Sequence, residues 1–117
     1  MEKFRGQIQI SFRYSEHLGP RFDVAGVTLR LEYADDYKFL STAHWDYDDY
    51  TDTVERGVID GLIESGVDPD LGIHITLQEV DFDYVNSSMR TFYTAAKCAV
   101  KSKAIINEVR KSNSPIK

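Results

Sequence analysis

Four carboxylates lie within the seven residues from Asp46 to Asp52. Calcium and magnesium bind oxygen ligands, so such a run offers the right atoms for either ion. It lacks the glycine at the sixth position and the distal glutamate of a calcium-binding loop. Two interpretations stay open: a solvated loop whose acids favour the N-terminus of a following helix, and a weak ion site. We expect no strong metal site here.

The histidines, serines and glycines of this chain do not have the spacing of a known catalytic or phosphate-binding motif. His17, His44 and His74 are far apart in the sequence and have neither HExxH spacing nor neighbouring cysteines, which argues against zinc. No GxSxG turn marks a nucleophilic serine, and the glycines do not form a phosphate-binding loop. We therefore expect a noncatalytic protein without a cofactor.

Basic side chains near the C-terminus form the best functional candidate. Arg90, Lys97 and Lys101 are spaced by seven and four residues, which places them on one face of a helix, and Lys103 is close by. They are either a solvated face whose positive charges complement the helix dipole, or a docking surface for RNA or an acidic partner.

Three aromatic residues, Trp45, Tyr47 and Tyr50, are interleaved with the acids before the first expected helix. Trp and Tyr are enriched where proteins bind one another, so the group could be a protein-contact patch. The alternative interpretation is a hydrophobic lid over the core.

The elements that must position these residues follow from hydrophobic periodicity. Period-two alternation predicts strands over 4–14, 27–33 and 73–77, and a turn at Asp35-Asp36 leads into a further strand over 37–43 whose alternation is less regular. Helical periodicity predicts helices over 52–65 and from the N-cap candidates at 86–88 to about residue 110. Residues 15–26 lose periodicity and predict a long loop, so the first three strands are expected to form an antiparallel meander. The fourth strand is expected to pair with that meander.

Capping residues fix the ends of the first helix. Asp52 and Glu55 have the spacing of a capping box, and Gly66 stands where a left-handed C-cap is expected. The order β-β-β-α-β-α predicts an α+β domain in which two helices cover one face of a four-stranded antiparallel or mixed sheet. We expect one domain over residues 1–111 and a frayed tail over 112–117.

The segment from Thr53 to Ala104 resembles domain IV of translation elongation factor G. The resemblance rests on a glycine-punctuated helix, a short strand, and an acid-Ser-Ser-like motif that leads into a helix rich in Phe and Ala. These residues are Val54-Glu55-Arg56-Gly57, Ile75-Thr76-Leu77, and Asn86, Ser87, Ser88, Phe92, Ala95 and Ala96. It implies the fold of ribosomal protein S5 domain 2, with a βαβ crossover, and a family role in which loops at one tip reach the ribosomal decoding centre.

The two loops that correspond to that tip differ from the family in charge. The first loop, residues 16–23, has Arg21 as its one basic residue, where the family is rich in glycine and basic residues. The second loop carries Asp81 and Asp83, and Asp83 stands where the family usually has histidine. Such carboxylates repel RNA phosphates, so we expect the fold to be kept and the ribosomal contact to be lost.

The charge distribution limits the partners of this chain. Residues 1–86 carry 18 acidic and 7 basic side chains, whereas residues 87–117 carry 1 acidic and 7 basic. The acidic part argues against indiscriminate nucleic-acid binding, and no DNA partner is expected. No apolar stretch predicts a membrane span or a secretory signal, which favours the cytoplasm. We expect an interaction module that binds a protein partner or self-associates, with ribosome or RNA binding in translation as the alternative.

Overall fold

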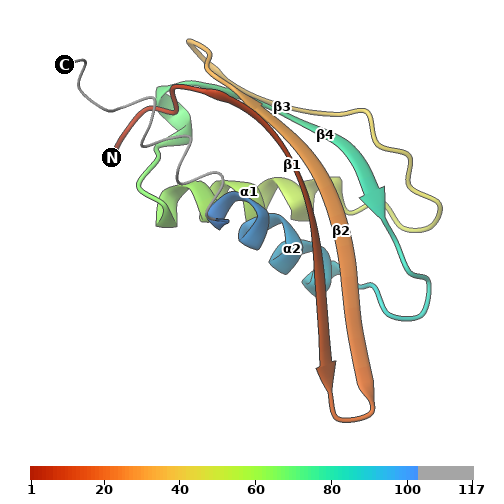
Figure 1. The fold of residues 1–117 in the computed structure, drawn as a ribbon. Coiled ribbons are helices and arrows are strands. Elements are labelled where there is room, and N and C mark those ends of the chain that lie inside the picture. The colour runs from red at the N-terminus through yellow and green to blue at the C-terminus, as the bar shows by residue number, and fades with distance from the viewer. Residues whose placement is uncertain (103–117) are drawn as a thin grey trace.

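The computed structural model describes residues 1–102, in which a four-stranded mixed sheet carries two α-helices on one face. The elements are β1 (Gln7–Leu18), β2 (Arg21–Glu32), β3 (Tyr37–Ser41), α1 (Thr51–Glu64), β4 (Ile73–Asp81) and α2 (Met89–Lys101), with a short 3-10 turn at Pro69–Leu71. Both helices lie on the concave face of the curved sheet (Figure 1). The α+β class and the order β-β-β-α-β-α are confirmed. Lys103, the expected end of the second helix near residue 110, and the tail lie outside the described residues.

The strand order is β1-β2-β4-β3, so the predicted three-stranded meander is wrong. β4 pairs antiparallel with β2 and parallel with β3. The helix α1 connects the parallel strands β3 and β4, which is the βαβ crossover that the resemblance implies. The core-facing residues of β4, Ile73, Ile75 and Leu77, are fully buried, which suits a central strand. All five residues of β3 are exposed or half-buried, which suits an edge strand.

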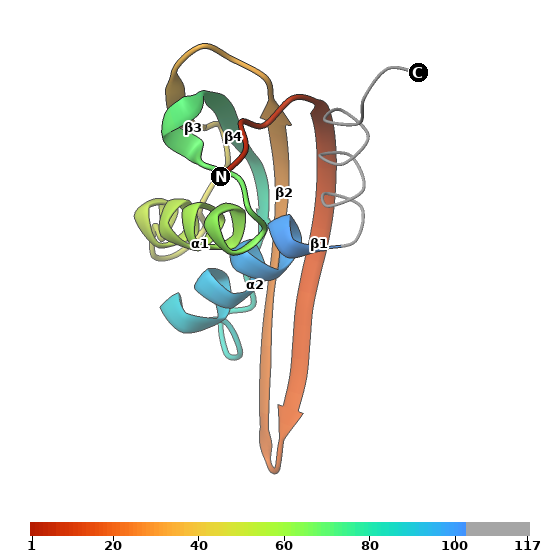
Figure 2. The same ribbon diagram turned by 90° about the vertical axis from the view of Figure 1, so that its left-hand side faces the viewer.

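Residues 15–26 form no long loop, because β1 and β2 continue as one hairpin to a two-residue turn. Leu18 pairs with Arg21 across Gly19 and Pro20, and Gly19 takes a φ of 65° that favours glycine. β4 pairs with β2 only from Gly26 to Glu32, so the far part of the hairpin is a two-stranded ribbon. Figure 2 shows it extending well past the helices. In such a ribbon neither face is fully buried, so the sequence is not forced to alternate there.

The ends of the two helices differ in how they are capped. The predicted bounds of the first helix, 52–65, match α1 within one residue, and Gly66 has the expected positive φ of 87°. The predicted capping box at its start is wrong, because the N-cap is Tyr50 and no side chain caps it. A capping box exists instead on α2, where the Ser88 and Thr91 side chains each accept a hydrogen bond from the other residue's backbone N–H.

The core lies between the sheet and the two helices. Its largest fully buried side chains include Phe4, Leu29, Leu62 and Phe92. Phe4 precedes β1 rather than opening it, although the sequence predicted a strand from this residue. The chain before it is held by a parallel bridge between Glu2 and Val67.

Candidate interaction surfaces

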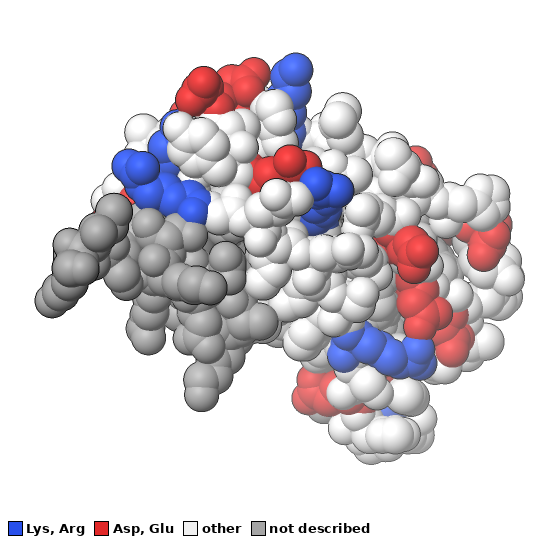
Figure 3. Space-filling view, turned by 45° about the horizontal axis from the view of Figure 1, so that its top comes forward, with Lys and Arg blue, Asp and Glu red and all other residues white. Residues whose placement is uncertain are grey.

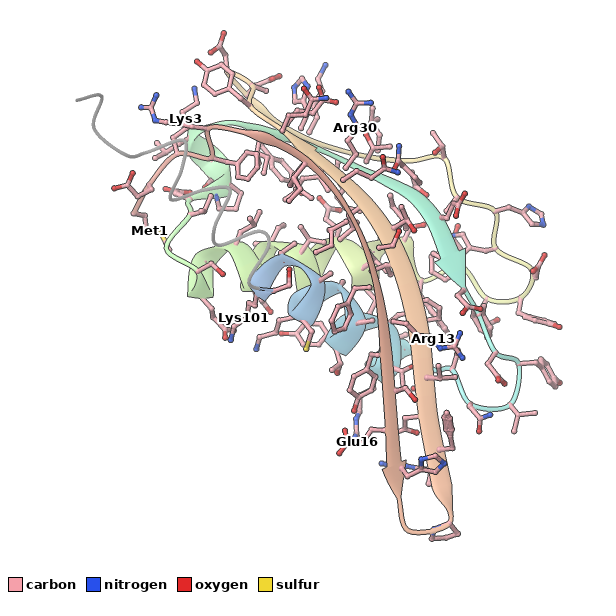
Figure 4. The ribbon with its side chains drawn as sticks, in the orientation of Figure 1. Met1, Lys3, Arg13, Glu16, Arg30 and Lys101 are labelled. Atoms are coloured by element: carbon pink, nitrogen blue, oxygen red, sulfur yellow. The ribbon has the colours of Figure 1, made fainter. Side chains whose placement is uncertain are left out.

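Lys97 and Lys101 point to a single acceptor on the neighbouring helix. The Nζ atoms of Lys97 and Lys101 lie 2.6 and 2.8 Å from the two carboxylate oxygens of Glu64 at the end of α1. The hydrogen bond from Lys101, followed by the one from Lys97, lowers the pKa of Glu64. The contact with Glu64 in turn raises the pKa of Lys97. Figure 4 shows Lys101 at the end of α2, beside the end of α1. The two lysines therefore clamp α1 to α2, and half of their charge is compensated within the chain.

Arg90 lies in a different place from these lysines. It lines an open groove between the two helices with Arg56 and two acids, Asp52 and Asp60. Asp60 accepts a hydrogen bond from the Tyr93 hydroxyl, which raises the pKa of Tyr93. The groove thus has balanced charge. The three basic residues predicted on one face therefore divide into a clamped pair, Lys97 and Lys101, and Arg90 in this mixed groove. Lys103, predicted close to them, lies outside the described residues.

The residues predicted at the two tip loops have local structural partners. Arg21 Nη2 lies 3.3 Å from Asp23 Oδ2 near the hairpin turn, where the His17 and Phe22 rings stack with centroids 4.3 Å apart. Asp81, at the end of β4, forms an ion pair with Arg13 of β1, whose side chain reaches across β2 in Figure 4.

Asp83 shapes the second loop. Its Oδ1 accepts hydrogen bonds from the backbone N–H groups of Val85 at 3.0 Å and Asn86 at 3.1 Å. These backbone donors lower the pKa of Asp83, so the carboxylate stays charged while it holds the turn. The Ser87 hydroxyl then ties this loop to the carbonyl of Val24 at 2.6 Å. The second loop is therefore anchored beside the hairpin and ends short of its tip (Figure 1).

Two of the three aromatic residues before α1, Trp45 and Tyr50, form the lid that the sequence offered as one of two interpretations. Trp45 contacts Phe92 with ring centroids 5.0 Å apart and Phe82 at 6.2 Å, and its indole N–H donates to Thr51 Oγ1 at 3.1 Å. Tyr50 also contacts Phe82 and Phe92. Trp45 and Tyr50 thus close the core between the β3–α1 and β4–α2 loops.

Tyr47 belongs to a second, outer layer. It is 52% exposed and lies over Phe82 and Tyr84, with ring centroids 5.2 and 4.9 Å apart. Tyr84 and Val85 are 72% and 81% exposed. We call Tyr47, Tyr84 and Val85 the tyrosine patch. Sequence reasoning missed Tyr84 and Val85, although two large apolar residues in a loop without periodicity were a usable signal.

The acids around the tyrosine patch are used in local hydrogen bonds. The Thr51 side chain, and after it the Thr51 backbone N–H that donates to Asp49 Oδ1 at 2.8 Å, lowers the pKa of Asp49. Asp46 Oδ1 lies 3.1 Å from His44 Nε2. Within residues 1–102, no group of three or more His, Cys, Asp or Glu side chains is arranged to hold a metal ion. His74 pairs with Asp36 at 2.7 Å, far along the chain from the other two histidines.

Comparisons with known proteins identify the fold and no family. No family model and no curated protein matches the chain. Among solved structures it resembles the crystal structure of ttk003000868 from Thermus thermophilus, with a TM-score of 0.75 and 19% identity. The match covers 94% of this chain and 16% of the Thermus protein, so the chain spans about one sixth of that protein's length. Among the described helices, none has the length and apolarity to cross a bilayer.

Proposed function

We propose that the chain is a noncatalytic interaction module that binds a protein partner, on a scaffold like domain IV of elongation factor G. The tyrosine patch is the observation that carries the proposal. Large apolar side chains that stay exposed beside one another, over a supporting aromatic layer, are typical of protein-contact surfaces. The scaffold assignment is supported by the quoted motif residues together with the fold.

The positions of the charged residues favour a protein over RNA. Glu64 compensates part of the charge of Lys97 and Lys101. Arg90 lies in a groove with two acids. RNA affinity depends on uncompensated Lys and Arg that replace condensed counterions. A translation-associated RNA binder is therefore the weaker of the two functions.

Affinity capture from a native lysate, with and without nuclease, tests the proposal. We expect bound proteins that resist nuclease and that are lost with the double variant Tyr84→Ser, Val85→Ser. Leu40→Ser is the matched control, because Leu40 is 59% exposed on β3, on the other face of the sheet from the helices. Capture that survives the patch variant unchanged would contradict the proposal.

A titration with ribosomal RNA fragments at low and physiological salt tests the alternative. We expect a flat response at both salt concentrations. Binding that weakens steeply with salt and disappears with Arg90→Glu would replace the protein-binding proposal by the RNA-binding one.

A further inference from the structure

The tyrosine patch is a preorganised surface. Tyr47 and Tyr84 come from different loops, yet their rings are in contact with centroids 4.9 Å apart. Phe82 lies beneath Tyr47 and is itself packed on Phe92 of the core, with centroids 5.3 Å apart. The Asp83 turn and the Ser87 hydroxyl hold the loop that carries Tyr84 and Val85. A ligand that binds here needs little ordering of the protein, which favours affinity.

The surroundings of the tyrosine patch are strongly acidic. The two loop regions that build it, residues 42–52 and 78–88, carry four and three carboxylates respectively and contain no Lys or Arg. The seven acids are Asp46, Asp48, Asp49, Asp52, Glu79, Asp81 and Asp83. Figure 3 shows acidic side chains following one another down the right-hand side, where Figure 1 draws these loops. Asp81 pairs with Arg13, and Asp52 lines the mixed groove with Arg56 and Arg90. Among the described residues, the other five acids form no ion pair with Lys or Arg.

We infer that the tyrosine patch binds a cationic peptide segment of a protein partner, in which arginine or lysine is interspersed with apolar side chains. The inference rests on the proposed function and names the chemistry of its partner. An apolar anchor covers Val85 and the tyrosine edges, a guanidinium stacks on a tyrosine face, and further cations approach the surrounding carboxylates. The same carboxylates repel the phosphates of RNA and of anionic lipid surfaces.

Fluorescence anisotropy with labelled synthetic peptides tests this inference. The probe is a Gly/Ser-based peptide with several arginines and two leucines. One control peptide has glutamate in place of each arginine, and another has serine in place of each leucine. We expect the arginine–leucine peptide to bind, the serine version to bind more weakly, and the glutamate version not to bind. Binding should weaken between low salt and about 0.15 M salt, because screening acts on exposed charges.

Variants of exposed residues assign the binding to the patch. Tyr84→Ser with Val85→Ser should weaken binding at least about tenfold, as loss of apolar anchors at an interface does. Asp46→Asn with Asp48→Asn should weaken binding and reduce its salt dependence. Leu40→Ser should leave binding unchanged. Thermal melts of each variant establish that it is folded, which is expected since all these residues are exposed.

Three outcomes would overturn the inference: no binding of the arginine–leucine peptide at low salt, equal binding of the glutamate peptide, or equal weakening by Leu40→Ser. Its failure is distinguishable from that of the proposed function. If capture from lysate still depends on Tyr84 and Val85 while the cationic peptide does not bind, the patch contacts a protein of other chemistry. If capture is indifferent to the patch, the proposed function itself fails.

Discussion

Gly61 lies where α1 packs against α2, and it is needed for this close approach. A Cβ at this position would lie 2.0 Å from Val100 Cγ2 and 2.8 Å from the backbone oxygen of Lys97. Alanine favours a helix by about 1 kcal/mol over glycine, but overpacking costs about 1–3 kcal/mol and the clash involves backbone that cannot turn aside. We expect Gly61→Ala to lower the free energy of unfolding by up to about 2 kcal/mol in urea denaturation. A gain in stability would show that the helices separate freely.

Phe92 belongs to the core and also supports the aromatic lid. It is fully buried and contacts Trp45, Tyr50 and Phe82. Phe92→Ala should lower the free energy of unfolding by about 3–5 kcal/mol, as large-to-small core changes do. It should also change the fluorescence of Trp45, the chain's one tryptophan. A loss below about 1 kcal/mol in denaturant melts would contradict this account of the core.

At the scale of elements, Glu64 connects the two helices and makes their stability depend on pH. Its folded pKa lies below the ordinary value of 4.5 because Lys101 and Lys97 bind the carboxylate. The stabilisation is therefore fully present above about pH 4.5 and is lost as the pH falls through the lower, folded pKa. We expect the difference in urea midpoint between wild type and Glu64→Gln to be present at about pH 7 and to shrink towards about pH 3. A difference that stays constant over this range would exclude the ion pairs as its source.

Capping distinguishes the starts of α1 and α2. Ser88 and Thr91 form reciprocal hydrogen bonds at the start of α2, whereas no side chain caps α1. We expect Ser88→Ala to cost about 1 kcal/mol in the free energy of unfolding. Asp52→Ala, the matched change in the first turn of α1, should cost less than about 0.5 kcal/mol, because only a dipole interaction is lost. Equal losses for Ser88→Ala and Asp52→Ala in denaturant melts would mean that the Ser88 cap does not stabilise α2.

At the scale of the whole molecule, the far end of the β1–β2 hairpin extends beyond the packed body. Residues 16–23 pair only with one another, while Val24 donates its N–H to Asn86 O at 3.2 Å. Isolated two-stranded ribbons are marginally stable. Hydrogen exchange should therefore be at least about tenfold faster for amides within 16–23 than for the amides of Ile8–Phe12 that face β2, with Val24 among the protected amides. Uniform protection along β1 would contradict this division.

The features that the sequence predicted depend on neighbours along the chain. The bounds of α1, the positive φ of Gly66, the start of α2 after Ser88 and the buried stripe through Phe92 were predictable. Each follows from helical periodicity or from hydrogen bonds within one turn. The four-stranded α+β class followed in turn from the order of the elements.

Tertiary structure decided the order of the strands in the sheet and the contacts between side chains that are distant in the sequence. It placed β4 rather than β3 next to β2, because β4 buries its core-facing residues whereas β3 has none that is fully buried. It paired Lys101 with Glu64, 37 residues away, which changed a predicted basic face into a clamp between helices. It also turned Trp45 inward and Tyr47 outward onto Tyr84. A local pattern cannot specify such contacts, because each partner comes from a segment distant in the sequence and is fixed only when the sheet and helices pack.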